Sequence, residues 1–375
     1  MSRSPENVAA FLLEQKSRDA VALIADRNYS YGELSDAAAK VAQYLVASNC
    51  PKGDRVLLLS DNSFFWAATY LGILSAGMVC VPVPTTTRPH ELQYFLVNTE
   101  ATLVAIQSKL FLKFESQLDA NHVLLDEPIA GRPALISLES LQNSEPAIPS
   151  YAVVAGEDLA ALMFTSGSTG KPRGVMVTHG NIRANTESII EYLELNRADR
   201  IMTVLPFHYC FGTSLLHTHL RVGGSLVLDQ KFLFPEKTLN RMQETECTGF
   251  AGVPSHYQVL LRKTTLRKRQ FPKLRHVQQA GGYLSQSFQQ ELCEALPTTK
   301  VFIMYGQTEA TARLTCLPPE FHRMKLGSIG KAIPGVTISV LSDSGKPVLP
   351  GENGEIVAEG ENIAKGYWRD PEETA

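Results

Sequence analysis

Short apolar runs alternate with helix-length segments along most of the 375 residues of this chain. The first runs are V-L-L-L from Val56, the stretch 78–83 and L-V-A-I from Leu103, and a helix is expected over residues 62–75. The run at 78–83 is continuously apolar, which is typical of a strand buried on both faces of a parallel sheet. This alternation predicts βαβ units and a doubly wound α/β fold.

The same pattern returns in the second half of the chain. Helices are expected over residues 179–193, 211–222, 235–245, 255–263 and 285–296. Strands are expected over residues 201–205, 225–228, 249–253, 276–280 and 299–304. We therefore expect two packed α/β subdomains, at about 1–165 and 166–325, with intertwined boundaries.

Two other stretches have a different signature. Residues 119–150 contain four prolines and show little periodicity, so we expect an irregular excursion there. From about residue 326, short strands alternate with turns such as D-S-G from Asp343. This pattern predicts a small β-barrel or β-sheet subdomain over residues 326–375.

The composition is that of a soluble globular protein, with 44% hydrophobic and 19% charged residues. A net charge of −3 gives no sign of the positively charged surface that binds nucleic acid.

Phe64 to Pro84 carries no charge over 21 residues, a length that can span a bilayer. Gly77 divides this stretch into a helix and a short strand, so we expect no membrane partner. None of the six cysteines forms a C-x-x-C pair, so we expect reduced thiols in a cytoplasmic protein.

A glycine-rich, positively charged loop lies between two apolar runs at residues 165–174, T-S-G-S-T-G-K-P-R-G. Glycine allows backbone N–H groups to approach a ligand, and successive N–H groups form an anion-binding concavity. The hydroxyls and Lys171 add donors, so a phosphate is the expected guest. A polar hairpin turn is the alternative, but the flanking runs attach the loop to a rigid sheet, where functional loops tend to lie. Pro172 excludes a Walker loop, which needs serine or threonine after the lysine.

Four motif loops are expected to share one edge of a sheet. The strands lead from Leu205 into P-F-H, from Val253 into P-S, from Gln279 into A-G-G and from Met304 into Y-G-Q-T-E. Because open α/β sheets bind their ligands at the carboxyl ends of the strands, these loops predict a common binding site.

These segments resemble those of the adenylate-forming enzymes, which include acyl-CoA synthetases, aryl-CoA ligases, luciferases and peptide-synthetase adenylation domains. The phosphate loop T-S-G-S-T-G-K-P-R-G-V-M-V-T-H is the most specific match. The other matches, in the family's order, are L-P-F-H-Y-C-F-G at 205–212, A-G-G-Y at 280–283, Y-G-Q-T-E-A-T at 305–311, G-E-I-V-A-E-G from Gly354, and G-Y-W at 366–368. The resemblance covers essentially the whole chain, and it implies the N-terminal core, residues 1–375, of such an enzyme. In the family, an aspartate for the ribose, a hinge and a small C-terminal domain with a catalytic lysine follow this region; we expect that domain to be absent from this chain.

The resemblance implies ATP and Mg²⁺ as cofactors and assigns residues to each. The phosphates of ATP would be bound by Thr165, Ser166, Gly167, Ser168, Thr169, Gly170 and Lys171. Adenine and the α-phosphate would be bound by Gly281, Gly282, Tyr283, Tyr305, Gly306, Gln307 and Thr308. Glu309 would be the Mg²⁺ ligand; the alternative is a surface carboxylate at a helix start, where the dipole favours it. For Arg173 we expect a structural role.

The resemblance also implies a pocket for the acyl group. Its expected lining is Phe207, Tyr209, Phe211, Ala251, Gln278, Met304, Ala312 and Arg313. The expected catalytic group consists of Lys171, Thr308, Glu309 and His208, although we regard His208 as pocket lining and assign it no proton transfer. Arg313 either meets a second anionic group on the substrate or points to solvent, and we expect the latter.

The residue after Phe207 bears on the substrate class. Amino-acid-activating relatives usually carry an aspartate there to pair with the α-ammonium, whereas this chain has His208 and no acidic residue from 206 to 228. An unpaired ammonium in an apolar pocket would be costly, so an acyl or aryl acid is favoured.

The expected function is ATP-dependent adenylation of a carboxylic acid, which gives acyl-AMP and pyrophosphate. Thioester formation on a carrier protein's phosphopantetheine arm or on coenzyme A follows. The alternative is an amino-acid-adenylating ligase, for proline or another small amino acid, that loads a carrier protein. A catalytically inactive binding protein is disfavoured, because the phosphate loop and Glu309 are both intact.

Overall fold

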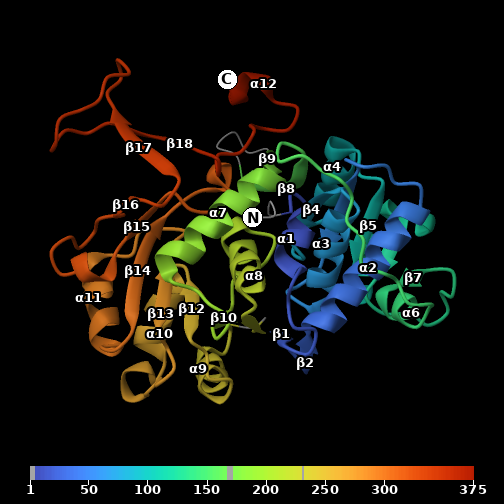
Figure 1. Ribbon diagram of the computed structural model, residues 1–375, viewed down its shortest axis with the longest axis horizontal. Helices are drawn as coiled ribbons and strands as arrows, with labels where there is room; N and C mark the ends of the chain where they lie inside the picture. The colour runs from blue at the N-terminus through green and yellow to red at the C-terminus, as the bar shows by residue number, and fades with distance from the viewer. Residues whose placement is uncertain (1–4, 167–171, 230–231) are drawn as a thin grey trace.

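Two sheets flanked by helices make up most of the molecule (Figure 1). The structure is a computed structural model, which describes residues 5–166, 172–229 and 232–375, apart from the side chains of Asn121 and Ser166. The predicted α/β class is confirmed, with parallel pairing through the centre of both sheets.

The seven-stranded sheet has the order β7-β6-β5-β3-β4-β8-β9. Its strands are β3 Arg55–Leu59, β4 Val79–Val83, β5 Leu103–Ile106, β6 Val123–Leu125, β7 Ile136–Ser137, β8 Leu159–Ser166 and β9 Pro172–Thr178. Its helices are α3 Phe64–Ser75, α4 Pro89–Thr99, α5 Ser108–Phe114 and α6 Leu138–Gln142. Strands β6 and β7 lie in the stretch 119–150, so the expectation of an irregular excursion is wrong for these residues. Strands of three and two residues are too short to produce a periodic pattern.

The nine-stranded sheet has the order β16-β15-β14-β13-β12-β10-β11-β1-β2. Its strands are β1 Val21–Ile24, β2 Asn28–Ser30, β10 Arg200–Thr203, β11 Ser225–Leu228, β12 Gly249–Gly252, β13 His276–Gln279, β14 Lys300–Tyr305, β15 Thr315–Leu317 and β16 Lys331–Ala332. Its helices are α7 His179–Leu193, α8 Cys210–Val222, α9 Pro235–Glu244, α10 Pro254–Lys263 and α11 Gln286–Ala295. The sheets cross the expected boundary near residue 165 in both directions, because β1 pairs with β11 while β9 pairs with β8. The division into subdomains itself remains a prediction.

Helices from both halves of the chain pack between the two sheets. Figure 1 shows α7 and α8 in the centre of the molecule, beside α1 Val8–Leu13 and α3. The rings of Trp66, from α3, and Phe207, after β10, lie 5.0 Å apart between centroids. Tyr70 on α3 hydrogen-bonds His217 on α8 at 2.8 Å, and both side chains are buried. One hydrophobic core therefore joins the two sheets and fixes their loops relative to one another.

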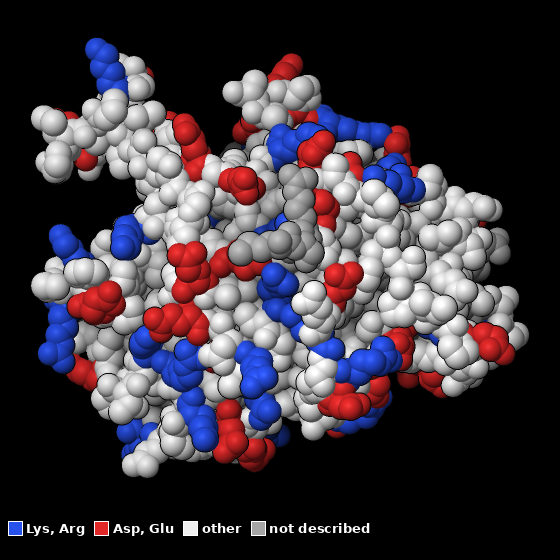
Figure 2. Space-filling model, viewed as in Figure 1, with Lys and Arg blue, Asp and Glu red and all other residues white. Residues whose placement is uncertain are grey.

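The region from residue 326 forms an antiparallel hairpin rather than a barrel. Strands β17 Val336–Leu341 and β18 Glu355–Gly360 pair with each other in a two-stranded sheet, which stands out from the body in Figure 1. The barrel alternative is therefore wrong, because two strands cannot close on themselves, and the small-sheet alternative is confirmed. In the described part of the chain, no helix has the length and apolarity needed to cross a bilayer. Figure 2 shows acidic and basic side chains interspersed on the face that carries the hairpin.

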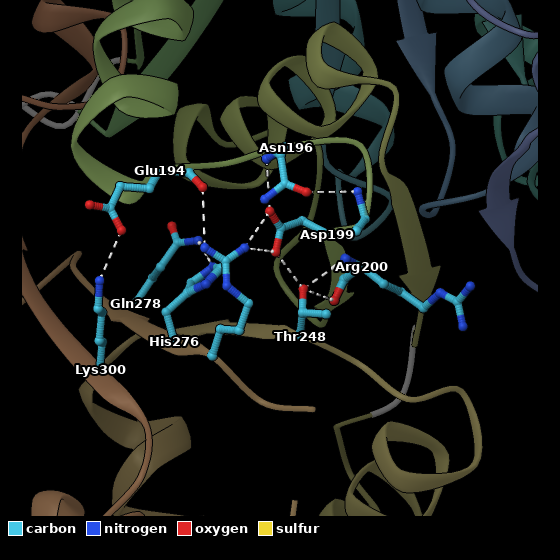
Figure 3. A network of polar contacts seen from close by, with 10 residues as sticks. Glu194, Asn196, Asp199, Arg200, Thr248, His276, Gln278 and Lys300 are labelled. Atoms are coloured by element: carbon cyan, nitrogen blue, oxygen red, sulfur yellow. Dashed lines mark hydrogen bonds and ion pairs between the residues drawn. The ribbon is translucent and has the colours of Figure 1, made fainter. Parts of the chain in front are cut away.

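A buried carboxylate connects the amino ends of strands β10, β12 and β13 of the nine-stranded sheet (Figure 3). Asp199 precedes β10 and accepts hydrogen bonds from Thr248 Oγ1 at 2.8 Å and from Arg275 Nη1 at 2.5 and 2.7 Å. The Asn196 backbone N–H also donates to it, at 2.8 Å. Burial alone would raise the pKa of Asp199, but these hydrogen bonds outweigh it and hold that pKa below its usual value. The network therefore stabilises the edge of the sheet opposite the motif loops.

We expect Asp199→Ala to lower the free energy of unfolding by about 2 kcal/mol at pH 7, since buried donors lose their acceptor while Arg275 can still reach water. A depressed pKa contributes stability above the unfolded value of about 3.9 and loses it as pH falls through the folded value. The difference between the two proteins in urea unfolding should therefore shrink below about pH 4. Lys300→Ala is the matched control: it breaks the exposed Lys300–Glu194 pair of the same network, at 2.9 Å, and should change little. An equal effect of both variants would contradict the structural role of Asp199.

Candidate active site

The motif loops meet at the carboxyl edge of the nine-stranded sheet. Strands β10, β12, β13 and β14 are neighbours in that sheet and run parallel. The loops that follow them are 204–209, 253–254, 280–283 and 306–309. The prediction that these four segments share one edge is therefore confirmed.

Glu309 lies in the turn that directly follows β14, within the 3₁₀ segment Thr308–Ala310. Its carboxylate is half-buried and accepts a hydrogen bond from Tyr367 Oη at 2.9 Å, while its backbone carbonyl accepts from Ala364 N–H at 2.8 Å. Burial, together with the Glu309 carboxylate, raises the pKa of Tyr367 to about 12. The phenol therefore keeps its proton at neutral pH and orients the carboxylate.

Tyr367 also connects Glu309 to the strand that leads away from the phosphate loop. The segment 365–368 runs antiparallel to β9: Met176 N–H donates to Gly366 O at 2.8 Å, and Trp368 N–H donates to Gly174 O at 2.7 Å. Sequence reasoning identified G-Y-W as a family match but missed this contact. Glu309 and Tyr367 are far apart in the sequence, so no local pattern indicates that their side chains meet.

The predicted phosphate-loop residues are only partly described. Thr165 is half-buried near the end of β8, and β8 and β9 form an antiparallel pair on either side of the loop. The residues Gly167, Ser168, Thr169, Gly170 and Lys171, and the side chain of Ser166, lie outside the described residues. Arg173, beyond the loop, forms ion pairs with Glu373 at 2.6 Å and Asp370 at 3.8 Å, which fits the structural role expected for it.

The segment expected to bind adenine leaves the sheet in a turn that requires glycine. Gly281 has φ +78°, and a Cβ atom there would lie 3.0 Å from Val253 Cγ1. Gln279 Nε2 donates to the Gly282 carbonyl at 2.8 Å and holds the turn. Tyr283 is 69% exposed, and Tyr305 at the end of β14 is half-buried, so both can be reached by a ligand at this edge.

The neighbouring loop places Thr308 against helix α8. Thr308 Oγ1 donates to Cys210 Sγ at 3.6 Å, and Cys210 is the first residue of α8. Gln307 is exposed, and Gly306 is half-buried. The chain turns sharply beyond Glu309, since Ala312 N–H donates to Ala310 O at 2.6 Å and Thr311, between them, has φ +63° and ψ −47°. This is a strained γ-turn, of a kind that concentrates at functional sites.

Two asparagines hold the chain beyond the γ-turn. Asn362 accepts from Thr311 Oγ1 through its backbone carbonyl at 2.7 Å, and its side chain donates to Arg313 O at 3.0 Å. Asn185 on α7 donates to the same carbonyl at 3.1 Å. Sequence reasoning missed both residues, because asparagines on a helix and in a loop carry no motif.

The expected acyl-pocket residues separate into two groups. Ala251 and Gln278 are buried neighbours across β12 and β13, and Met304 is buried near the end of β14 on the same face as Phe302, the partner of Gln278. Phe211 and Ala312 are also buried. Tyr209 is 55% exposed instead, and Phe207 packs on Trp66 in the core between the sheets. The structure thus places Ala251, Gln278 and Met304 on one face of neighbouring strands, buries Phe211 and Ala312, and directs the side chains of Tyr209 and Phe207 elsewhere.

His208 is half-buried beside Tyr209, with ring centroids 4.3 Å apart. Burial lowers the pKa of His208 to about 4, although Asp61 opposes the shift. The imidazole is therefore neutral at pH 7. This agrees with a lining residue rather than with a proton donor.

Arg313 does not point to solvent, so that expectation is wrong. The side chain is 1% exposed, and its guanidinium lies 3.9 Å from the centroid of the Phe211 ring. The γ-turn and the two asparagines direct residue 313 inward between the sheet and helix α8. The sequence could not reveal this, because the contacts come from residues distant along the chain.

The described residues fit a magnesium ion held mainly by water and phosphate oxygens. No group of three or more histidine, cysteine or acidic side chains arranged to hold a metal ion occurs among them, and Glu309 supplies a single oriented carboxylate. Mg²⁺ usually keeps several waters and takes one or two carboxylates with substrate phosphates.

Comparisons with known proteins agree with this geometry. The chain matches the AMP-binding enzyme family over residues 12–368. A feruloyl-CoA synthase of Amycolatopsis sp is 31% identical over 349 residues, which cover 92% of this chain and 68% of that protein. A linear gramicidin synthase of Brevibacillus parabrevis is 28% identical over 376 residues, covering 100% of this chain and 7% of that protein. The solved structure of apo MatB from Rhodopseudomonas palustris is similar with a TM-score of 0.88 at 28% identity, covering 99% of this chain and 73% of that one.

The sequence and the fold lead to the same assignment. The family match extends over nearly all of the described residues and includes each motif loop at the carboxyl edge. The chain therefore belongs to the family of AMP-binding enzymes.

Proposed function

We propose that this AMP-forming acid–thiol ligase activates a carboxylic acid that lacks an α-amine. A carboxylate oxygen attacks the α-phosphorus of ATP, which gives acyl-AMP and releases pyrophosphate. A thiol then attacks the acyl carbonyl, which forms the thioester and releases AMP. The thiol belongs to coenzyme A or to the phosphopantetheine arm of a carrier protein. Relatives named as a CoA synthase and as a gramicidin synthase support both acceptors.

One observation carries the proposal: Glu309 is held by Tyr367 at 2.9 Å, next to the strand that follows the phosphate loop. In this arrangement Glu309 would hold Mg²⁺, which neutralises phosphate charge when it is bound. Thr308 would donate to the α-phosphate, and Lys171 with the loop hydroxyls would bind the β- and γ-phosphates. These groups would stabilise the charge that develops in the transition state, which is the main form of catalysis in phosphoryl chemistry.

The turn after β13 supports a nucleotide base at the same edge. Gly281 and Gly282 leave the backbone open to a flat ring, and Tyr305 lies at the end of the neighbouring strand. Gly306 and Gln307 continue that strand toward Thr308. Base, α-phosphate and metal ligand would then follow one another along the edge of the sheet.

Charge in the acyl pocket supports an acid without an α-amine. His208 stands where amino-acid-activating relatives usually carry an aspartate, and its pKa of about 4 keeps it neutral at pH 7. Arg313 adds a buried positive charge to the pocket lining. A substrate ammonium would meet a like charge instead of a carboxylate, which disfavours it.

The experiment is ATP–pyrophosphate exchange with the full-length protein over a panel of carboxylic acids and amino acids. We expect exchange to require Mg²⁺ and to be faster with carboxylic acids that lack an α-amine. An amino acid that exceeds every such acid by tenfold, about 1.4 kcal/mol, would reject this substrate class and support an amino-acid-adenylating ligase. No exchange with any acid would reject adenylation itself.

A further inference from the structure

Arg313 is a buried cation without a counter-ion among the described residues. None of the ion pairs between those residues includes it, and its Nε and Nη2 atoms are buried and make no hydrogen bond of normal geometry. A neutral polar group, the Tyr192 hydroxyl, interacts with the guanidinium. Nη1 has a long contact, 3.4 Å, to the carbonyl of Ala312. Burying an unpaired charge costs several kcal/mol, and arginine cannot escape by losing its proton.

The groups that surround the guanidinium are neutral. The titratable side chains that interact with it are Tyr192 from α7, through its hydroxyl, Cys210 from α8 and Cys316 from β15. Burial raises the pKa of the Cys316 thiol to about 12 and also raises the pKa values of Cys210 and Tyr192. These groups therefore carry no negative charge at pH 7 and cannot neutralise Arg313.

The unpartnered atoms have a defined geometry. Nε–H and the adjacent Nη2–H of a guanidinium point the same way, and together they match the two oxygens of one carboxylate. The Phe211 ring lies against the guanidinium at 3.9 Å and fixes its plane. Asn185 and Asn362 fix the backbone carbonyl of the same residue. The donors are thus held in place before any ligand binds.

We propose that Arg313 binds a second carboxylate on the acid substrate, so that the enzyme activates one end of a dicarboxylic acid. This inference rests on the proposed function and narrows it. The reacting carboxylate lies toward Thr308, whose loop follows β14, and the second carboxylate lies against Nε and Nη2 of Arg313. A monocarboxylic acid would leave the buried charge unpaired, and a substrate ammonium would add a second positive charge.

The test compares dicarboxylic acids with their monomethyl esters, which keep the carbon chain but replace one charge with a methyl ester. The panel consists of malonate, succinate, glutarate, adipate and terephthalate, each paired with its monoester. In ATP–pyrophosphate exchange with the full-length protein, we expect the best diacid to exceed its monoester by about 100-fold in kcat/KM, as for a desolvated charge pair. Arg313→Met should remove this preference, mainly by raising the KM of the diacid, and should lower exchange with the diacid far more than exchange with the monoester.

A second measurement separates recognition from folding. Arg313→Met replaces an unpaired buried charge with an apolar side chain, so we expect an equal or higher unfolding temperature without substrate. The diacid should raise the unfolding temperature of the wild-type protein but not that of the variant.

If the wild-type protein has the same kcat/KM for the monoesters as for the diacids, the inference is overturned and the proposed function still stands. An equal loss of diacid and monoester activity in Arg313→Met would place the residue against the nucleotide and would also overturn it. The absence of exchange with every acid would reject the proposed function itself.

Discussion

Glu309→Ala is expected to lower the rate of adenylation by two to three orders of magnitude, roughly 3–4 kcal/mol on the scale of one lost electrostatic contact. The physical reason is that Glu309 is the one acidic side chain in the loop after β14, where Tyr367 orients it at 2.9 Å. Its removal leaves phosphate charge uncompensated in the transition state. The measurement is ATP–pyrophosphate exchange over a range of Mg²⁺ concentrations, with the unfolding temperature measured in parallel.

A matched control follows strand β15 of the same sheet. Glu320 is also the middle residue of a three-residue 3₁₀ segment, Pro319–Phe321, and is exposed. Glu320→Ala should leave exchange unchanged, because a carboxylate that only favours a helix start contributes less than about 1 kcal/mol. Tyr367→Phe should have a small effect, since it removes an orienting hydrogen bond but leaves the carboxylate. Near-normal exchange in Glu309→Ala would reject the metal assignment.

The regular elements of the second half were predictable from local signals. The helix expected over 179–193 is α7 with the same bounds, and the strand expected over 225–228 is β11. Apolar runs with glycine or proline between them were sufficient there. Strand partners were less predictable, because β1 pairs with β11 from a position about two hundred residues earlier in the chain. Hydrogen bonds between distant segments leave no periodic trace in either one.

The active-site loops were predictable from motifs, but their support was not. Glu309 was identified through Y-G-Q-T-E, whereas Tyr367 and Asn362 reach this region from the end of the chain. Arg313 is the clearest example of a position whose environment the sequence does not predict. A charged residue in a loop is usually exposed, and here the turn at Thr311 and the hydrogen bonds of Asn185 and Asn362 reverse that expectation. The positions that sequence reasoning missed are those at which tertiary contacts override a local preference.

The γ-turn links the positions of the Thr308–Glu309 segment and Arg313, the two functional parts of the site. Thr308 and Glu309 lie before it, and Arg313 lies after it. Leu314 N–H donates to Tyr305 O at 2.9 Å, so the chain returns to β14 within a few residues. A displacement on one side of the turn is therefore transmitted to the other. Gly306, before the turn, packs closely against the backbone of Ala312 and Arg313, after it.

Gly306→Ala is expected to lower kcat/KM by about 100-fold, the effect of displacing positioned groups by about 1 Å. A Cβ atom at residue 306 would lie 2.0 Å from the carbonyl oxygen of Ala312 and 2.8 Å from Cα of Arg313. Both contacts are to backbone, which cannot rotate away, so the loop of Glu309 and the segment of Arg313 must separate. The overpacking should also cost about 1–3 kcal/mol of stability, so exchange is measured at a temperature where the variant is folded.

Gly156→Ala is the matched control, because the nearest atom to its Cβ is Glu6 Oε2 at 3.4 Å, an ordinary contact. Normal kcat/KM in Gly306→Ala would mean that the loops on the two sides of the γ-turn move independently, and the positioning of Glu309 would then have to come from Tyr367 alone.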